Sequence, residues 1–219
     1  MHKMTKVVFA AIATAMVAAA QNPITADSPF QVRYASNLTS GDSVINLTNT
    51  GANGASLFGP GFGGAIGNIC VNVYALDPGE ELVSCCSCLI TPDGLASLSV
   101  VNDLINNTNN GTRPTSVVIK LVSTIAGGEG GTGTSCANSA ANISTATLAT
   151  GLAAWGTTIH AAPGGGVTAV TETAFTPATL SAGEAASLQN RCRGILGNSS
   201  GAGVCNSCRA GGLGATRLH

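Results

Sequence analysis

The fold is set by one stretch of this chain, Ile69-Cys-Val-Asn-Val-Tyr-Ala-Leu-Asp-Pro-Gly-Glu-Glu-Leu-Val-Ser-Cys-Cys-Ser-Cys88. Two runs rich in β-forming residues, Ile69–Leu76 and Glu81–Cys85, flank Asp77-Pro-Gly-Glu80. Proline presets the backbone for the first turn position and glycine tolerates the next one. The stretch therefore predicts a β-hairpin with a Pro-Gly turn.

Further strands are predicted on both sides of this hairpin. Each is a short run of β-branched or alternating residues that ends in Asn, Ser or Gly. The runs are Phe30–Tyr34, Asp42–Thr48, Leu95–Val101, Ser116–Thr124 and Val167–Phe175. About seven short strands separated by turns favour a mainly β protein, a β-sandwich-like domain with one or two short helices that is stapled by disulfides.

One helix has a clear start. Ser181-Ala-Gly-Glu184 is a capping box, and Ala185, Leu188, Cys192 and Ile195 then recur at helical spacing. This spacing points Cys192 into the core, towards a partner in the sheet. A second helix is predicted around Thr147–Thr158, although two glycines weaken it.

Residues 1–20 have the pattern of a secretory signal peptide. Lys3 and Lys6 precede an apolar stretch from Val7 to Val17 that is too short to span a bilayer, and Ala18-Ala-Ala20 offers a cleavage site. We expect residues 21–219 to form a single β-rich, disulfide-stabilised domain with an extended N-terminal segment. No later stretch predicts a membrane span, so the expected location is secreted, extracellular and associated with the cell surface.

The cysteines are the main candidates for site residues. An even number in an exported chain predicts disulfides, and the eight are Cys70, Cys85, Cys86, Cys88, Cys136, Cys192, Cys205 and Cys208. If the 85–88 cluster is extended, Cys86 and Cys88 face one side of the strand and Cys85 the other, so they reach different partners. A bond between adjacent cysteines would be strained. We predict that the cluster is tied to the region from Cys192 to Cys208.

Two alternatives to disulfides remain open for these cysteines. Cys85 with Cys88 and Cys205 with Cys208 form two C-x-x-C pairs, which would suit a tetrahedral zinc site. Cys86 interrupts the first pair, however, and an oxidising compartment favours disulfides. A thioredoxin-like redox role would require a βαβ context that the pattern lacks. The sequence thus predicts no catalytic residue, no bound metal and no cofactor.

The composition is poor in charge. Only 9% of the residues are charged, and removal of residues 1–20 leaves seven basic against ten acidic side chains, a net charge of −3. Binding of nucleic acid through phosphate neutralisation is therefore not expected. A surface with so little charge either relies on the hydroxyl and amide groups of Thr, Ser and Asn for its solubility or is covered by neighbouring subunits, and assembling extracellular subunits fit the second case. Four basic residues gather near the end, as scattered solvated arginines or an anion-binding patch: Arg191, Arg193, Arg209 and Arg217.

An enzyme is not predicted. After residue 20 the only histidines are His160 and His219, so a nucleophilic triad would depend on His160. A two-carboxylate glycosidase needs no histidine, and its candidates are Asp77, Glu80, Glu81, Asp93, Asp103, Glu172 and Glu184. Turn and capping roles already explain several of them. Sequons for N-glycosylation, several of which composition alone could produce, occur at Asn37, Asn46, Asn106, Asn110, Asn142 and Asn198.

Four segments resemble those of an uncharacterised group of secreted, cysteine-containing proteins from environmental bacteria. They are Gly67–Asp77, Glu81–Pro92, Trp155–His160 and Cys205–Leu213. The resemblance covers most of the chain after residue 20 and implies bacterial export. It implies no activity, so no catalytic residue is carried over from it.

The expected function is that of an extracellular structural protein that self-assembles with copies of itself into a filament, a pilus-like fibre or a surface layer. The extended part near Gln21–Thr50 lacks edge-protecting lysines, so we expect it to add a strand to a neighbour's sheet. The glycine-rich residues 51–67 form either a flexible loop or a contact with a neighbouring subunit. The alternatives are a monomeric module that binds a glycan or a surface, and a Cys-ligated metal or redox protein.

Overall fold

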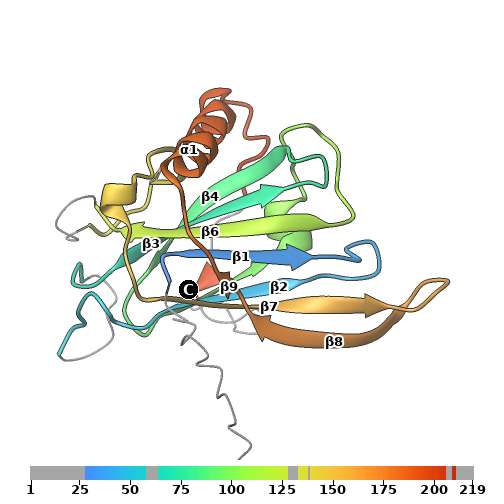
Figure 1. Ribbon diagram of the computed structural model, residues 1–219, viewed down its shortest axis with the longest axis horizontal. Helices are drawn as coiled ribbons and strands as arrows, with labels where there is room; N and C mark the ends of the chain where they lie inside the picture. Colours follow the sequence, from blue (N-terminus) through green and yellow to red (C-terminus); the bar gives the residue numbers. More distant parts are fainter. Residues whose placement is uncertain (1–27, 58–63, 128–132, 138, 206–208, 211–219) are drawn as a thin grey trace, which may run out of the picture.

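The computed structural model describes residues 28–57, 64–127, 133–137, 139–205 and 209–210. They form a two-sheet, mainly β structure with one long helix, as the sequence predicts (Figure 1). The predicted signal peptide, residues 1–20, lies outside the described residues. All neighbouring strands within the two sheets are antiparallel.

Sheet A contains the predicted hairpin. Its strands lie in the order β4 (Leu82–Ile90), β3 (Ile69–Leu76), β6 (Val117–Ile125), β1 (Phe30–Ala35) and β9 (Thr176–Pro177). Sheet B has the order β10 (Arg209–Ala210), β5 (Leu95–Ser99), β2 (Val44–Asn49), β7 (Leu152–Ala161) and β8 (Val167–Ala174).

The β-hairpin predicted around the Pro-Gly turn is confirmed. Strand β3 pairs with β4 from Ile69 opposite Ile90 to Leu76 opposite Leu82. Asp77 closes the turn, because its side chain accepts hydrogen bonds from the backbone N–H groups of Gly79 and Glu81, each at 2.9 Å. All eight residues of β3 are buried. Both faces of this strand must therefore be covered.

The covering layers differ in kind. One face of sheet A packs against sheet B through a large apolar core to which β2, β3, β5, β6 and β7 all contribute. The other face packs against helix α1 (Ala182–Gly197), as Figure 1 shows above β4 and β6. Successive side chains of β3 therefore point into different layers. Val71 and Val73 join the inter-sheet core, while Tyr74 packs under the helix.

Helix α1 begins where the capping box predicts. The Ser181 hydroxyl accepts a hydrogen bond from the Glu184 N–H at 3.1 Å, and the Glu184 carboxylate pairs with Lys120 of β6 at 2.7 Å. The four residues predicted to face the core are the buried ones: Ala185, Leu188, Cys192 and Ile195. Three shorter helices complete the described elements: η1 (Val100–Leu104, a π-helix), η2 (Ser139–Ala141) and η3 (Thr145–Thr147).

The second predicted helix is wrong. Residues 145–147 form only the short η3, and residues 152–161 form β7, an inner strand of sheet B. Gly151 has a φ of +95°, a left-handed conformation that ends the preceding segment. Short apolar runs do not distinguish a buried helix from a buried strand, and here pairing with β2 and β8 decides for the strand.

The strand predicted at Leu95–Val101 is also shorter than expected. It ends at Ser99, whose hydroxyl accepts the Asn102 N–H at 2.8 Å and thereby caps the π-helix η1. The backbone N–H of Ser99 in turn donates to the buried Asp103 carboxylate at 2.7 Å. Side chains that compete for backbone hydrogen bonds thus stop the ladder here.

The N-terminal part is not an unpaired extension from residue 28 onward. Strand β1 lies between β6 and β9 in sheet A, and β2 lies between β5 and β7 in sheet B. Both are inner strands, because other strands of the same chain pair with each of them on both sides. The remainder of the predicted donor, residues 21–27, lies outside the described residues.

Candidate functional site

The cysteines form a disulfide framework centred on strand β4. Three disulfides join described residues, namely Cys70–Cys136, Cys85–Cys192 and Cys86–Cys205, with Cα atoms 5.5, 5.9 and 5.5 Å apart. The last two tie the 85–88 cluster to the C-terminal region, as the sequence predicts. Cys88 is disulfide-bonded as well, while Cys208 lies outside the described residues.

Alternation along β4 sends neighbouring cysteines to opposite layers. Cys85 belongs to the cluster under α1, where it bonds Cys192, whereas Cys86 and Cys88 pack with the inter-sheet core. This is the arrangement expected from the period-two geometry of a strand. The framework therefore clamps the helix on one side of β4 and the C-terminal segment on the other.

A zinc site does not fit this framework. The sulfur of Cys85 is bonded to Cys192 and that of Cys205 to Cys86, so neither is a thiolate that could ligate a metal. Within the part of the chain that the structure describes, no group of three or more His, Cys, Asp or Glu side chains could hold a metal ion.

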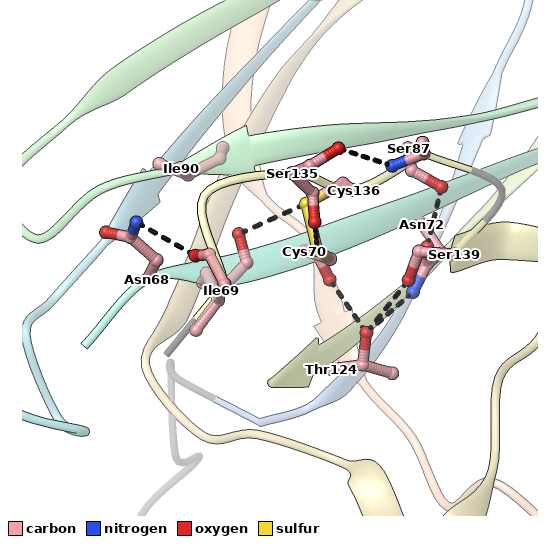
Figure 2. Close-up of a disulfide and its surroundings, with 12 residues drawn as sticks. Asn68, Ile69, Cys70, Asn72, Ser87, Ile90, Thr124, Ser135, Cys136 and Ser139 are labelled. Atoms are coloured by element: carbon pink, nitrogen blue, oxygen red, sulfur yellow. Dashed lines mark hydrogen bonds between the residues drawn. A yellow bond between two sulfur atoms is a disulfide. The ribbon is translucent and has the colours of Figure 1, made fainter. Parts of the chain in front are cut away.

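The Cys70–Cys136 disulfide sits on a buried polar network (Figure 2). Asn72, on β3, is fully buried; its amide donates to the Val122 carbonyl at 3.0 Å and its side-chain oxygen accepts from the Ser87 hydroxyl at 2.8 Å. The Ser87 oxygen accepts the Ala140 N–H at 2.8 Å. The network thus fastens the loop that carries Cys136 and η2 to the outer face of sheet A.

Tyr74 adds a second anchor for the same loop. Its hydroxyl donates to the Ala140 carbonyl at 2.8 Å, and the side chain is fully buried. Burial raises the pKa of the Tyr74 phenol well above its ordinary value, because the charged phenolate would lose its hydration. The disulfide, the polar network and Tyr74 together make this side of the domain a structural support.

A buried arginine joins the two sheets at the other side. Arg33, on β1, is 7% exposed. It donates from Nη1 to the carbonyl and the hydroxyl of Thr173 on β8, at 2.7 and 2.8 Å, and from Nη2 to the hydroxyl of Thr158 on β7, at 2.7 Å. Its guanidinium also lies 5.7 Å from the ring centre of Phe175, within the range of a cation–π contact.

A glycine makes room for this arginine. A Cβ atom at Gly156 would lie 2.6 Å from Nε of Arg33, closer than real Cβ contacts come. Sequence alternation in Phe30–Tyr34 gave no sign that Arg33 faces inward, since polar residues in such a pattern normally face solvent. They face inward here because α1 and its cluster cover the opposite side of sheet A, where Phe30 and Val32 pack.

Beside Arg33 lies a pocket of about 460 Å³ to which β1, β6, β7, β8 and β9 contribute. It is lined by Val32, Arg33, Tyr34, Val118, Thr158, Thr173, Ala174 and Thr176. Arg33 is the only charged residue of this lining, and three threonines and a tyrosine supply hydroxyl groups. The arrangement can bind a ligand through hydrogen bonds.

Sheet B ends in an exposed edge strand. All eight residues of β8 are exposed, and within the described chain β8 pairs with β7 alone. The hairpin of β7 and β8 lies at the lower right of Figure 1. Val167 and Val170 expose 47% and 56% of their surface, and Glu172 is the only charged residue of the strand. An open edge of this kind is a template for another strand.

The outer face of sheet B carries the only tryptophan of the chain, Trp155, which is 39% exposed. Asn46 lies directly opposite it on β2 and donates to the Glu172 carboxylate at 2.7 Å. The Asn46 side-chain oxygen accepts from the Ser97 hydroxyl at 2.6 Å. An aromatic ring thus lies beside an ordered amide and carboxylate on one flat face.

The candidate residues for acid–base chemistry are dispersed. His160 is exposed on β7, and its Nε2 lies 3.0 Å from the hydroxyl of Thr171. Asp77 closes the hairpin turn, Asp103 accepts the Ser99 N–H, and Glu184 pairs with Lys120. These contacts give each of the three carboxylates a structural role. Among the described residues, the hydrogen-bond partner of the His160 ring is the Thr171 hydroxyl and not the carboxylate that a triad would require.

The C-terminal arginines do not form one described patch. Arg191 donates to the Glu80 carbonyl at 2.8 Å and Arg193 to the Ala141 carbonyl at 3.2 Å, so both hold α1 to neighbouring loops. Arg209 lies on β10, the strand at one end of sheet B, and Arg217 lies outside the described residues.

No family model, curated protein or solved structure matches this chain. Among the described residues, no helix combines the length and the apolar character that crossing a membrane requires.

Proposed function

We propose that this protein is a secreted structural subunit that assembles with copies of itself through strand addition. The observation that carries the proposal is β8, an edge strand with eight exposed residues and one strand partner in the described structure. Its sequence, Val-Thr-Ala-Val-Thr-Glu-Thr-Ala, is rich in β-branched residues. A neighbour's strand can pair with its free backbone groups.

The usual protection of an edge is limited on β8 to one charged residue, Glu172. Soluble proteins block such edges with lysine, proline, inward-pointing charge or a covering loop. Strand β8 contains neither lysine nor proline, and the only lysine among the described residues is Lys120, in sheet A. The irregularity between His160 and Ala161 lies at the hairpin end and leaves the rest of the β7–β8 pairing regular.

Exposed apolar residues elsewhere support burial by a neighbour. Leu57 and Ile66, in the described parts of the glycine-rich loop, are 90% and 65% exposed. The disulfide framework supports the extracellular part of the proposal, because disulfides persist in oxidising compartments. It would also keep a weakly charged subunit folded outside a cell.

The decisive experiment is electron microscopy of the purified native protein, with sedimentation velocity on the same samples. We expect ordered polymers of the intact protein. The variant Val170→Lys should shift the population towards monomers, because a charge on the edge must be desolvated when another strand pairs with it. The control Thr112→Lys adds the same charge in an exposed loop outside the sheets and should assemble normally.

Two results would refute the proposal. One is an intact protein that stays monomeric at high concentration, and the other is Val170→Lys polymerising as readily as the parent chain. Dimers without polymers would show that β8 pairs with β8 of a single partner, because a two-fold contact closes on itself. Removal of residues 21–27 separately tests the N-terminal donor, since it leaves β1 intact.

A second candidate function, a module that binds a glycan or a surface, is favoured by the face around Trp155. Its ring can stack on an apolar face of a sugar while Asn46 and Glu172 hydrogen-bond hydroxyl groups. Glycan-array binding by a stable monomer that Trp155→Ala abolishes would support this function over assembly.

A further inference from the structure

Arg33 carries a positive charge into the space between the sheets, and the described residues do not neutralise it there. The one ion pair within the described chain is Lys120–Glu184, so no described carboxylate lies within 4.0 Å of the Arg33 guanidinium. The charge of Glu172 acts on Arg33 only through space, and desolvation outweighs it, lowering the pKa of Arg33 from its ordinary value. A buried charge is costly unless it is paired.

The role of Arg33 in joining the sheets explains only part of its chemistry. Its three hydrogen bonds to described residues all go to neutral oxygens, those of Thr173 and Thr158. Nε is buried and has no hydrogen-bond partner. A guanidinium has five N–H donors, arranged so that two of them match the two oxygens of a carboxylate. Both charge and donor capacity are therefore left over.

The pocket beside Arg33 has the lining that an anion with hydroxyl groups needs. It contains no carboxylate that would repel an anion. The hydroxyls of Tyr34 and Thr176 face no hydrogen-bond partner among the described residues, and Tyr34 is 58% exposed. Val32, Val118 and Ala174 form apolar walls. One charged anchor with a few polar groups in a partly apolar pocket is the usual make-up of a small-molecule site.

We infer that this pocket binds a small hydroxycarboxylate, with the carboxylate paired to Arg33 and the ligand hydroxyls bonded to Thr176 and Tyr34. Two sources share this chemistry: a sugar acid, as a monosaccharide or at the end of a chain, and a short hydroxy acid. The pocket lining includes Thr173 and Ala174 of β8, whereas Trp155 is not part of it. The site therefore does not use the Trp155 ring, but it borders the end of the edge strand β8.

The test is isothermal titration calorimetry of the whole folded protein with three probes, galacturonate, galactose and lactate. Galactose carries a hydroxymethyl group where galacturonate has its carboxylate, so the pair isolates the contribution of charge. We expect galacturonate to bind at least about tenfold more tightly than galactose, as a charge-assisted hydrogen bond from Nη2 of Arg33 to the carboxylate provides. Tighter binding of galacturonate than of lactate identifies a sugar acid, and the reverse order identifies a short hydroxy acid.

Two variants locate the binding. Thr176→Val removes one lining hydroxyl and leaves the hydrogen bonds of Arg33 to Thr158 and Thr173 in place, so it should weaken binding about fivefold, the effect of one neutral hydrogen bond. Thr115→Val makes the same change outside the pocket and should bind as the parent does. Arg33→Gln should abolish binding where circular dichroism shows that the variant still folds.

The inference is overturned if neither hydroxycarboxylate binds at tens of millimolar. It is equally overturned if galactose binds as tightly as galacturonate, or if Thr176→Val leaves the affinity unchanged. Because Thr176→Val does not disturb the bonds of Arg33 to Thr158 and Thr173, the outcome does not depend on whether Arg33→Gln folds.

Discussion

Among the three disulfides between described residues, the one that closes the shortest loop should contribute most to stability. Cys70–Cys136 spans 66 residues and Cys85–Cys192 spans 107. If each bridge acted alone, the longer loop would give the larger effect. Cys85–Cys192 does not act alone, however, because Cys86–Cys205 joins nearly the same two places in the chain.

The magnitude follows from the loop that each bridge closes when the others are intact. With Cys86–Cys205 present, the unfolded chain already connects Cys85 to Cys192 by one residue step at one end and thirteen at the other, about 14 in all. Chain-entropy arithmetic gives about 3 kcal/mol for a loop of that size. No such shortcut shortens the loop of Cys70–Cys136, for which 66 residues give about 4.3 kcal/mol.

The perturbation is therefore a pair of double variants, Cys70→Ala/Cys136→Ala and Cys85→Ala/Cys192→Ala. All four cysteines are at most 9% exposed, so the loss of packing is similar in both and largely cancels in the comparison. Guanidinium unfolding followed by the fluorescence of Trp155, the only tryptophan, gives the free energy of unfolding by linear extrapolation. We expect the first variant to be less stable than the second by about 1.3 kcal/mol.

The reverse order, with Cys85→Ala/Cys192→Ala the less stable by 1 kcal/mol or more (about a fivefold change in the unfolding constant), would refute the nested-loop reasoning. Such a result would mean that the clamp on α1 acts through native packing and not through the entropy of the unfolded chain. Matching circular dichroism spectra of the two folded variants serve as the control that neither has changed its fold.

Three further predictions concern single positions. Gly156→Ala should lower the free energy of unfolding by about 1–3 kcal/mol, because its Cβ would meet the fixed Arg33 side chain; urea unfolding measures this. Gly194→Ala should raise it by about 0.5–1 kcal/mol, because Gly194 lies in α1 with nothing within 4 Å of an added Cβ; an unchanged or lowered value contradicts this. Tyr74→Phe should cost about 1 kcal/mol at pH 7 through the lost hydrogen bond to Ala140. Since the raised pKa keeps the buried Tyr74 phenol protonated while the unfolded chain loses that proton above about pH 10, the parent should lose stability as the pH rises past 10, and Tyr74→Phe should lose less; parallel pH profiles would contradict the assignment.

The parts of the fold that sequence predicted well are those with strong local chemistry. The Pro-Gly turn and its flanking runs gave the β3–β4 hairpin, and the capping box gave the start of α1. Helical spacing pointed Cys192 towards the sheet, and strand alternation separated Cys85 from Cys86. Each depends on contacts within a few residues or on a fixed period, so neighbouring layers do not alter them.

The predictions were wrong where the structure of a segment depends on the strands and layers that pack against it. Residues 152–161 are apolar enough for a buried helix or a buried strand, and only pairing with β2 and β8 makes them β7. The part of the N-terminal region from residue 28 on looked like a free donor strand because nothing local shows that β1 and β2 enter two different sheets. The sequence also could not predict that Arg33 faces sheet B. Alternation divides the residues of a strand between its two faces, but it does not show which face packs against the other sheet.

By itself, the sequence determined a disulfide-rich β domain with a low charge, a central hairpin and one capped helix, because composition, turn residues and residue spacing act locally. Only the tertiary structure decided which cysteines pair, that Arg33 lies between the sheets beside a hydroxyl-lined pocket, and that β8 is left as an exposed edge. Several of those features depend on contacts between distant residues, such as Arg33 with Thr158 and Thr173, which are more than a hundred positions away. No local pattern encodes them, because the packing of whole layers against each other determines which distant groups meet.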